Sequence, residues 1–276
     1  MRFGFVLPNN VGVEDPHEVV DLGVRAEELG FDSVWVNHHI LHVGYVKERL
    51  DTKPYQDALI TLTWLASQTT KIQIGTSVLV MPYLHPMSLA KQLATLDQLS
   101  NGRLVVGLGA GSLPEENEAL GVPYKSRGRY CNEFLEVLKK LWTEEEASFN
   151  GEFFSFDNIS AYPKPQQQPH PLIVIGGNRP AALKRLARFG DGWHPLNVSA
   201  DGVERRMASL REEVEAAGRT QIPQAVQVRL DITRVDKDSI AAYEQAGVTE
   251  LVMHVASSNV AKQAAAIEAF ASDMIN

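Results

Sequence analysis

The chain has 276 residues, of which 44% are hydrophobic and 22% are charged, a composition typical of a globular protein with a sizeable core. Its formal net charge of −8 argues against binding to nucleic acid or an anionic membrane through a broad basic face. Cys131 is the only cysteine, which excludes an intrachain disulfide and a thiolate metal cluster. With no signal peptide and no apolar run of membrane-spanning length, these features predict a cytoplasmic protein.

Short apolar strands alternate with amphipathic helices along the first half of the chain. We expect strands at 2–7, 33–36, 71–82 and 104–108, and helices at 16–29, 55–67, 86–99 and 129–142. Asp15 is placed to cap the first helix and Pro16 to occupy its first turn. The stretches 41–54 and 114–127 show no period and are expected to be loops.

The second half repeats the same alternation after an excursion at about 144–171. Further strands are expected at 172–175, 192–194, 225–232 and 250–255, and helices at 179–189, 201–217, 236–246 and 258–271, the last capped by Ser258. The excursion carries alternating phenylalanines and a Pro/Gln-rich piece, and suits a small surface hairpin. A doubly wound open sheet would use the same units, but eight strands in one domain, residues 1–276, favour an α/β fold closed as a (β/α)8 TIM barrel.

The third expected strand, KIQIGTSVLVMP, is interrupted by small residues. Gly75, Thr76 and Ser77 separate two apolar runs, and a glycine inside such a run marks a bulge or a close approach. We interpret the stretch as a barrel strand whose carboxyl end is bent open beneath a flat ligand, although an ordinary strand with a polar end would show the same residues.

Active sites of β/α barrels lie at the carboxyl ends of the strands. Two glycine-rich turns follow expected strands, one at Gly109–Ser112 and one at Gly176-Gly177-Asn178. The first suits the approach of a backbone to a flat ring or its tail, although a lone glycine-rich run of this kind also suits a tight turn. The second exposes N–H groups just before a helix, which favours an anion, although it also suits an ordinary βα turn.

Histidines end two of the strands. His38 and His39 follow the second strand, and strand alternation predicts that at most one of them points into the barrel mouth. With His42 they suggest a metal, but no carboxylate lies at ligand spacing, so no metal site is expected. Glu115 and Glu116 are interpreted as solvated charge. Cys131 is interpreted as a small core residue rather than a nucleophile.

Four blocks of the sequence together resemble one known family. They are FGFVLP, VWVNHH, GTSVLVMPYLHPMSLAKQLATLDQLSNGRLVVGLGAG and PLIVIGGNRPAALKRLARFGDGWHP. The chain resembles the bacterial luciferase-like monooxygenase superfamily, and most of all its branch that depends on the deazaflavin coenzyme F420. The likeness runs nearly from end to end, and the family fold is a β/α barrel with an excursion.

The resemblance implies a cofactor site. Thr76, Ser77 and Val78 would form a bulge behind the ring, with a non-proline cis peptide between Ser77 and Val78 in F420-using members. Ala110, Gly111 and Ser112 would line the cofactor, and Gly176, Gly177 and Asn178 would receive its phosphate. His39 matches a family histidine that is a candidate proton donor or substrate contact. His38 stands where many F420-dependent relatives have an aspartate at the deazaflavin edge, so FMN is the alternative cofactor.

The resemblance leaves three functions open. The leading one is hydride transfer between F420 and a small organic substrate. The second is an FMN-dependent monooxygenase similar to alkanesulfonate monooxygenases, supplied with reduced flavin by a separate reductase and using oxygen. The third is a non-catalytic flavin-binding relative. A homodimer is expected by analogy, and the residues suggested for the wall of the substrate pocket are Tyr45, Tyr124, Arg127 and His194.

Overall fold

The computed structural model describes residues 1–275, and within them eight parallel strand positions close into a barrel. The third position is split into β3 and β4, and both halves pair with β5, which closes the sheet. In chain order the barrel strands are β1 (Arg2–Val6), β2 (Ser33–Val36), β3 (Gln73–Thr76), β4 (Leu79–Val80), β5 (Leu104–Gly109), β8 (Leu172–Gly176), β9 (Gly192–His194), β10 (Ala225–Asp231) and β11 (Glu250–His254). The predicted TIM barrel is confirmed.

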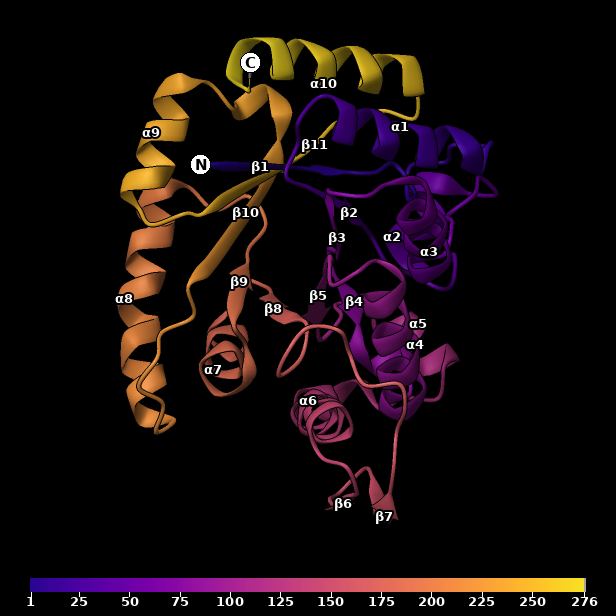
Figure 1. Cartoon of the computed structure of the whole chain (residues 1–276), viewed down its shortest axis with the longest axis vertical. Helices are drawn as coiled ribbons and strands as arrows, with labels where there is room; N and C mark the ends of the chain where they lie inside the picture. The colour runs from indigo at the N-terminus through magenta and orange to yellow at the C-terminus, as the bar shows by residue number, and fades with distance from the viewer. Residues whose placement is uncertain (276) are drawn as a thin grey trace.

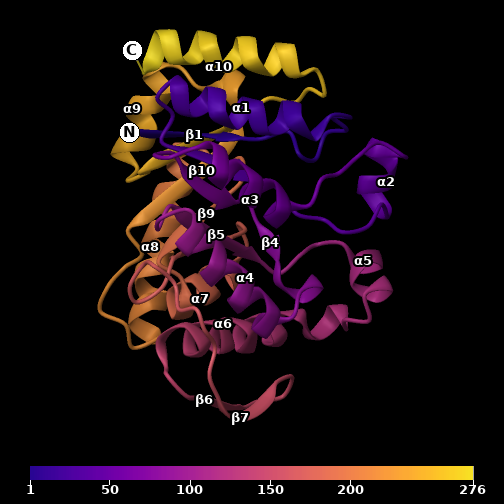
Figure 2. The same cartoon turned by 45° about the vertical axis from the view of Figure 1, so that its right-hand side comes forward.

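Helices surround the barrel, and the first of them, α1, lies side by side with the last, α10 (Figure 1). The helices outside the barrel are α1 (Pro16–Glu28), α3 (Ala58–Gln68), α4 (Pro86–Leu99), α6 (Arg127–Thr143), α7 (Pro180–Phe189), α8 (Ala200–Ala216), α9 (Lys237–Gln245) and α10 (Val260–Met274). Two shorter helices, α2 (Gly44–Leu50) and α5 (Pro114–Ala119), project on one side of the molecule (Figure 2). The excursion is the predicted hairpin, formed by antiparallel β6 (Ala147–Asn150) and β7 (Ser155–Ile159).

The inside of the barrel is built around Trp35. Its indole is fully buried, and a Cβ placed on Gly75 would lie 2.5 Å from Trp35 Cε3. Gly75 therefore makes room for the indole rather than forming the bulge itself. At the amino ends of the strands, Trp35 Nε1 donates to Ser33 Oγ at 2.6 Å, and Ser33 in turn bonds to the buried Glu250 carboxylate. These hydrogen bonds fill the amino-terminal end of the barrel interior.

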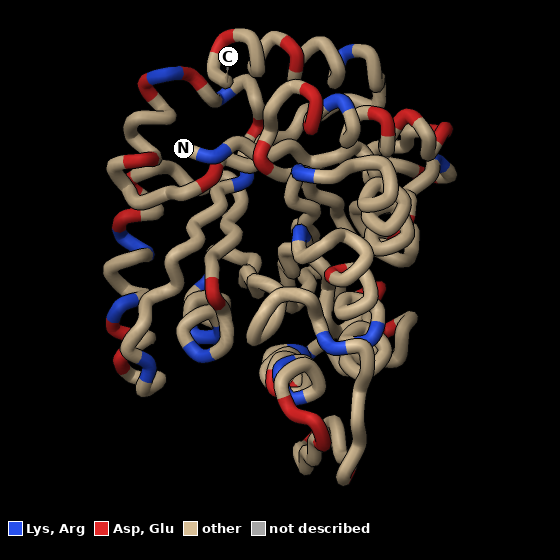
Figure 3. The backbone as a smooth tube through the Cα atoms, in the orientation of Figure 1, with Lys and Arg blue, Asp and Glu red and all other residues tan. Residues whose placement is uncertain are grey.

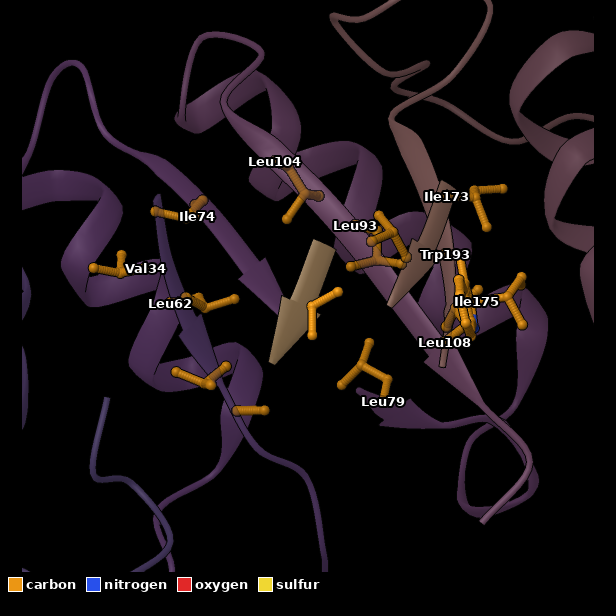
Figure 4. Packing of buried hydrophobic residues seen from close by; sticks show 14 of the residues in the cluster. Val34, Leu62, Ile74, Leu79, Leu93, Leu104, Leu108, Ile173, Ile175 and Trp193 are labelled. Atoms are coloured by element: carbon orange, nitrogen blue, oxygen red, sulfur yellow. The ribbon is translucent and has the colours of Figure 1, made fainter. Parts of the chain in front are cut away.

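The larger part of the core lies between the strands and the helices. Figure 4 shows Leu62 of α3 and Leu93 of α4 among strand side chains such as Val34, Ile74 and Leu104. Buried hydrophobic side chains from the strands and from the helices fill the space between these two layers, as a parallel sheet covered by helices requires. Charged residues lie mainly on the outer helices and loops, with both signs interspersed (Figure 3).

The bulge between β3 and β4 is held by one hydroxyl. Thr76 Oγ1 donates to Gly107 O at 2.8 Å and accepts from Gly107 N at 2.9 Å. A Cβ on Gly107 would lie 1.8 Å from Thr76 O, so only glycine fits beside this crossing. The Ser77–Val78 peptide bond is cis, as the resemblance implies.

Several sequence-based predictions of local structure were wrong. Residues 41–54 and 114–127 contain α2 and α5, which were expected to be loops. The last helix is capped by Asn259, whose side chain accepts from Lys262 N at 2.9 Å, and not by Ser258. Asp15 does cap α1, through a bond from His17 N at 2.9 Å, as predicted. Very short helices have too few turns to show a period, which explains why α2 and α5 were missed.

The Thr76 hydroxyl generates the first prediction. Replacing Thr76 by valine keeps the shape but leaves the buried N–H and C=O of Gly107 without their partner, at a cost of about 1–3 kcal/mol for each group. We expect Thr76→Val to lower the free energy of unfolding in urea by that order, while Thr76→Ser stays near the wild type. Equal stability of the valine and serine variants would contradict this account.

Candidate active site

The bulge lies directly against the two glycine-rich turns. A Cβ built on Gly109 would lie 2.6 Å from Val78 Cγ2, and one built on Gly176 would lie 2.9 Å from Val78 Cγ1. The Val78 side chain thus occupies the space that these glycines leave empty. The three segments that were predicted separately from the sequence meet at one place on the barrel mouth.

The end of β5 forms one wall of this place. Ala110 and Gly111 are half-buried and Ser112 is exposed. Gly111 has a φ of +70°, and a Cβ there would meet Val80 Cγ1 at 2.7 Å and Tyr83 OH at 3.5 Å. Glycine is therefore required at this position both by the backbone conformation and by the Val80 side chain, which packs where a Cβ would lie.

Two of the suggested pocket residues lie at the rim beside Ser112. The Tyr124 hydroxyl donates to Ser112 O at 3.4 Å, and the Arg127 guanidinium lies 3.6 Å from the centre of the Tyr124 ring. Arg127 Nη1 also donates to Tyr124 O at 2.8 Å. The two side chains form one unit above the end of β5.

The second glycine-rich turn leads into α7. Gly177 has a φ of +114°, and the Asn178 side chain is bound on both sides to the backbone of Leu196, with Nδ2 donating to Leu196 O at 2.8 Å. Arg206 Nε donates to Asn178 O at 3.3 Å. The amide side chain of Asn178 is thus already used, and any anion would be met by backbone N–H groups at the start of α7.

His39 belongs to a chain of three hydrogen-bonded side chains. Its Nδ1 lies 2.6 Å from Glu116 Oε2 and its Nε2 lies 2.6 Å from the Tyr45 hydroxyl. Glu116 comes from α5 and Tyr45 from α2, the two short helices that the sequence did not reveal. The Glu116 side chain is fully buried, whereas Tyr45 is 45% exposed. The chain therefore runs from a buried carboxylate to the solvent side of the mouth.

The protonation of this chain follows from its partners. Burial pushes the pKa of Glu116 upward, but the hydrogen bonds from His39 and from the N–H groups of Leu41 and Ile40 outweigh it and hold the pKa below 4.5. Since the carboxylate is ionised, Nδ1 of His39 carries the proton that Glu116 accepts, and Nε2 is the acceptor. Burial raises the pKa of Tyr45, so its hydroxyl stays protonated and donates to Nε2.

His38 has a different environment. Its buried ring accepts a hydrogen bond at Nδ1 from Val80 N, at 3.1 Å, which links the end of β2 to β4. Burial lowers the pKa of His38 to about 4, so the ring is neutral with its proton on Nε2. Both rings lie near Tyr83, at centroid distances of 6.2 and 6.3 Å for His38 and His39. β2 ends at Val36, so strand alternation does not set the directions of these two side chains, and the expectation that at most one of them points into the mouth stays a prediction.

A polar layer lies under the mouth. Ser77 Oγ is 2.8 Å from His194 Nε2, and His194 stacks on Trp35 with ring centres 4.7 Å apart. Burial and the nearby Arg229 charge lower the pKa of His194 to about 3. Arg229 Nη1 donates to Ser77 Oγ at 3.1 Å and to Ser77 O at 3.2 Å, and also to Asn37 Oδ1. His194 is therefore buried between Trp35 and Ser77, and its place in a substrate pocket stays a prediction.

Unpaired polar atoms gather at this end of the barrel. Within the described residues, the buried side-chain atoms without a hydrogen-bond partner here are Asn37 Nδ2, Tyr55 OH, Gln56 Oε1, Tyr83 OH, His194 Nδ1, Arg229 Nε and His254 Nδ1. Buried polar groups are normally paired, so this concentration indicates a binding site for a polar ligand. A large planar cofactor with many acceptor and donor groups fits it.

Sequence reasoning missed or misread several of these residues. Glu116 was interpreted as solvated charge, but it is fully buried against His39, so that prediction was wrong. Arg229 follows no motif, because it is one inward side chain within an ordinary alternating strand. Cys131 is fully buried and burial raises its pKa to about 12, which confirms its core position. No cluster of three metal-ligating side chains occurs in residues 1–275, and the absence of a metal stays a prediction.

The sequence profile of the luciferase-like monooxygenase family matches residues 1–272. The chain belongs to this family. A Kineococcus radiotolerans protein named F420-dependent glucose-6-phosphate dehydrogenase is 35% identical over 240 residues, which cover 83% of this chain and 67% of that protein. The predicted family, and with it an oxidoreductase enzyme, is confirmed.

Two solved structures show how closely the luciferase-like fold is kept. Monooxygenase RslO1 from Streptomyces bottropensis has a TM-score of 0.82 at 22% identity, over 100% of this chain and 99% of that one. An F420-dependent secondary alcohol dehydrogenase, solved with an F420–acetone adduct, has a TM-score of 0.81 at 19% identity, over 99% and 98%. No helix in residues 1–275 has the length and apolar character needed to span a membrane.

The buried Glu116 generates the second prediction. A carboxyl group whose pKa is lowered by folding stabilises the fold above its ordinary pKa of 4.5, and this contribution is lost as the pH falls through the folded-state value. We expect Glu116→Gln to unfold at lower urea concentration than the wild type at pH 7, and the difference to shrink as the pH is lowered below 4.5.

Glu115 provides the matched control, since it is the exposed neighbour of Glu116 on the same helix. Glu115→Gln should unfold like the wild type at every pH. A Glu116→Gln deficit that is the same at pH 7 and in acid would contradict the ionised state assigned to this carboxyl group.

Proposed function

We propose that this protein is an oxidoreductase that binds coenzyme F420 and transfers a hydride to or from a small organic substrate. The observation that carries the proposal is the packing of Val78 against Gly109 and Gly176, which brings the expected ring seat and phosphate cradle together. The F420-dependent name of the 35% identical relative supports the same cofactor. The substrate is not set by that name, because the chain aligns with only 67% of that protein.

Each of the expected cofactor-binding residues would have its own role. Ser77 and Val78 would support the ring, the half-buried backbone at Ala110 and Gly111 would line it, and the backbone at Gly177 before α7 would hold the phosphate. When bound, F420 would supply the hydride chemistry. The neighbouring polar atoms of Tyr83 and Asn37 would find partners on the ligands.

His39 would move the proton that accompanies the hydride. Its Nε2 accepts a hydrogen bond from Tyr45, which is the exposed end of the chain, while its Nδ1 is held by Glu116. If Nε2 takes a proton from a substrate hydroxyl, the buried Glu116 carboxylate stabilises the resulting imidazolium. Glu116 therefore orients the ring, without touching the substrate itself.

FMN is the second candidate, and His38 is the observation that favours it. His38 stands where many F420-dependent relatives carry aspartate, and its Nδ1 is already bound to Val80 N. In this alternative a separate reductase would supply reduced FMN and oxygen would be consumed.

We further propose that the protein forms a homodimer and is located in the cytoplasm.

Cofactor titration separates these candidates. The purified protein would be titrated with F420 and with FMN while fluorescence is followed. We expect micromolar or tighter binding of F420 and weaker binding of FMN. Tighter FMN binding together with oxygen uptake in the presence of reduced FMN would favour the monooxygenase, and binding of neither would refute both.

Gly177 generates the third prediction. A side chain at its φ of +114° strains the backbone, and a Cβ there would lie 3.1 Å from Ala182 Cβ in the first turn of α7. We expect Gly177→Ala to weaken F420 binding at least about tenfold, because one or two misplaced phosphate hydrogen bonds at about 1.5–3 kcal/mol each suffice.

Gly218→Ala is the control for backbone strain. Gly218 also has a positive φ, of +72°, but a Cβ there meets no atom within 4 Å, and the residue lies between α8 and β10. Both variants should lose some stability, and only Gly177→Ala should lose F420 affinity. Parallel losses of affinity in the two variants would argue against a phosphate cradle at Gly177.

His39 generates the fourth prediction. We expect His39→Gln to lower kcat about 10²–10⁴-fold, the usual range for loss of a general acid or base, with little change in F420 affinity. Turnover would be followed by the deazaflavin absorbance, starting with glucose 6-phosphate and 2-propanol as substrates. Tyr45→Phe keeps the ring but removes the hydroxyl, and should have a smaller effect on kcat. An unchanged kcat in His39→Gln would remove His39 from the mechanism.

A further inference from the structure

Arg229 places a cation in the barrel mouth without an acidic partner. Its Nη1 donates only to neutral groups, Asn37 Oδ1 and the Ser77 hydroxyl and carbonyl oxygens. Among residues 1–275 it forms no ion pair with any carboxylate. Asp231, two residues along β10, is bonded to Thr233 N and Oγ1 instead. Arg229 is partly buried, and a guanidinium taken partly out of water without a counter-charge is costly, which favours an anionic partner.

The unused part of the guanidinium has the geometry of an anion receptor. Its Nε is buried without a partner, and Nη2 makes no hydrogen bond within the described chain, since all three bonds use Nη1. Nε and Nη2 together form the edge that binds two oxygens of a carboxylate or a phosphate in parallel. Nη1 meanwhile fixes the plane of the group against β2 and the bulge.

Two further residues near Arg229 carry unpaired polar groups. Asn37 is 7% exposed, and its Nδ2 has no partner while its Oδ1 holds Arg229. The buried Tyr55 hydroxyl is also unpaired, and burial raises its pKa, so it remains a donor. Arg49 and Arg229 both lie close enough to Tyr55 to act on its charge. The Tyr55 ring is 5.9 Å from the His39 ring, centre to centre.

These groups border the expected cofactor site. Arg229 Nη1 bonds to Ser77 of the expected ring seat, and Asn37 directly precedes His38, which is expected at the ring edge. The other expected cofactor residues come from the ends of β5 and β8. Tyr55 extends the group toward His39, because the two rings lie 5.9 Å apart, centre to centre.

We propose that Arg229, Asn37 and Tyr55 form an oxyanion subsite for the substrate, which accordingly carries a carboxylate or a phosphate group. The subsite rests on the proposed function, because it requires the cofactor to be bound at the neighbouring ring seat of Ser77 and Val78. Anchoring the anionic end of the substrate on Arg229 holds the rest of the molecule against His39. Arg229 thus determines specificity, while His39 moves the proton.

Binding of simple oxyanions tests the subsite without a known substrate. Inorganic phosphate and acetate would each be titrated by calorimetry into the protein saturated with F420, so that the cradle before α7 is already filled. We expect one of them to bind to the wild type, and binding at least about tenfold weaker in Arg229→Gln, from the loss of a charge-assisted pair of hydrogen bonds. The tighter of the two anions identifies the substrate as a phosphate or a carboxylate.

Arg25→Gln is the control, because Arg25 is an exposed residue of α1 that pairs with Glu28 and Glu268 and belongs to neither the expected cofactor site nor the proposed subsite. In the F420-loaded protein this variant should bind the anion like the wild type. Failure of F420 itself to bind would count against the proposed function, whereas the subsite would still be tested by comparing anion binding to the wild-type and Arg229→Gln apoproteins.

The remaining outcomes are decisive. Absence of binding of both anions to the wild type, or equal binding by Arg229→Gln, overturns the subsite. If circular dichroism shows that Arg229→Gln is unfolded, Arg229→Lys replaces it, since lysine keeps the charge and loses the two-pronged edge. Weaker anion binding by Arg229→Lys supports the subsite, and unchanged binding overturns it.

Discussion

The site depends on the Val78 side chain lying where Gly109 and Gly176 have none. The contact brings the bulge, the end of β5 and the turn before α7 within van der Waals reach of one another. A larger side chain at either glycine would push the bulge outward, and Thr76 could then no longer bridge to Gly107. The shape of the mouth is therefore fixed by the tight packing of small residues. An increase in side-chain volume at one of these positions would displace the neighbouring segments.

Two charges of opposite sign lie at the mouth, the fully buried carboxylate of Glu116 and the partly buried guanidinium of Arg229. Glu116 is satisfied by His39 and by two backbone N–H groups, so its charge is stabilised within the protein. Arg229 has only neutral partners, so its charge is left for a ligand. Burial of an ionised group is tolerated only with partners. Glu116 therefore orients groups within the site, whereas Arg229 is available to bind an anion.

The sequence was informative where local chemistry decides the structure. Pro86 at a first helical position and the Asn101-Gly102 stop give the bounds of α4, Pro86–Leu99, because caps and breakers act over one turn. The bulge was recognisable because Gly75 and Ser77 interrupt an apolar run. Glu116 could not be recognised, since an acidic pair in a polar stretch looks the same whether or not a histidine from another segment lies above it. Arg229 was hidden for the same reason: its partners follow strands about 190 and 150 positions away along the chain.

The two short helices α2 and α5 have a consequence for how this scaffold can change. They provide Tyr45 and Glu116, whereas the residues expected to seat the cofactor come from the strands and from the turns that directly follow them. Connections tolerate replacement better than barrel strands do. Replacing both of these connections together would exchange the partners of His39, Tyr45 and Glu116, and would leave the expected cofactor-binding residues unchanged. Grafting either one alone would leave His39 with half of its hydrogen bonds, so the two segments form a single exchangeable module.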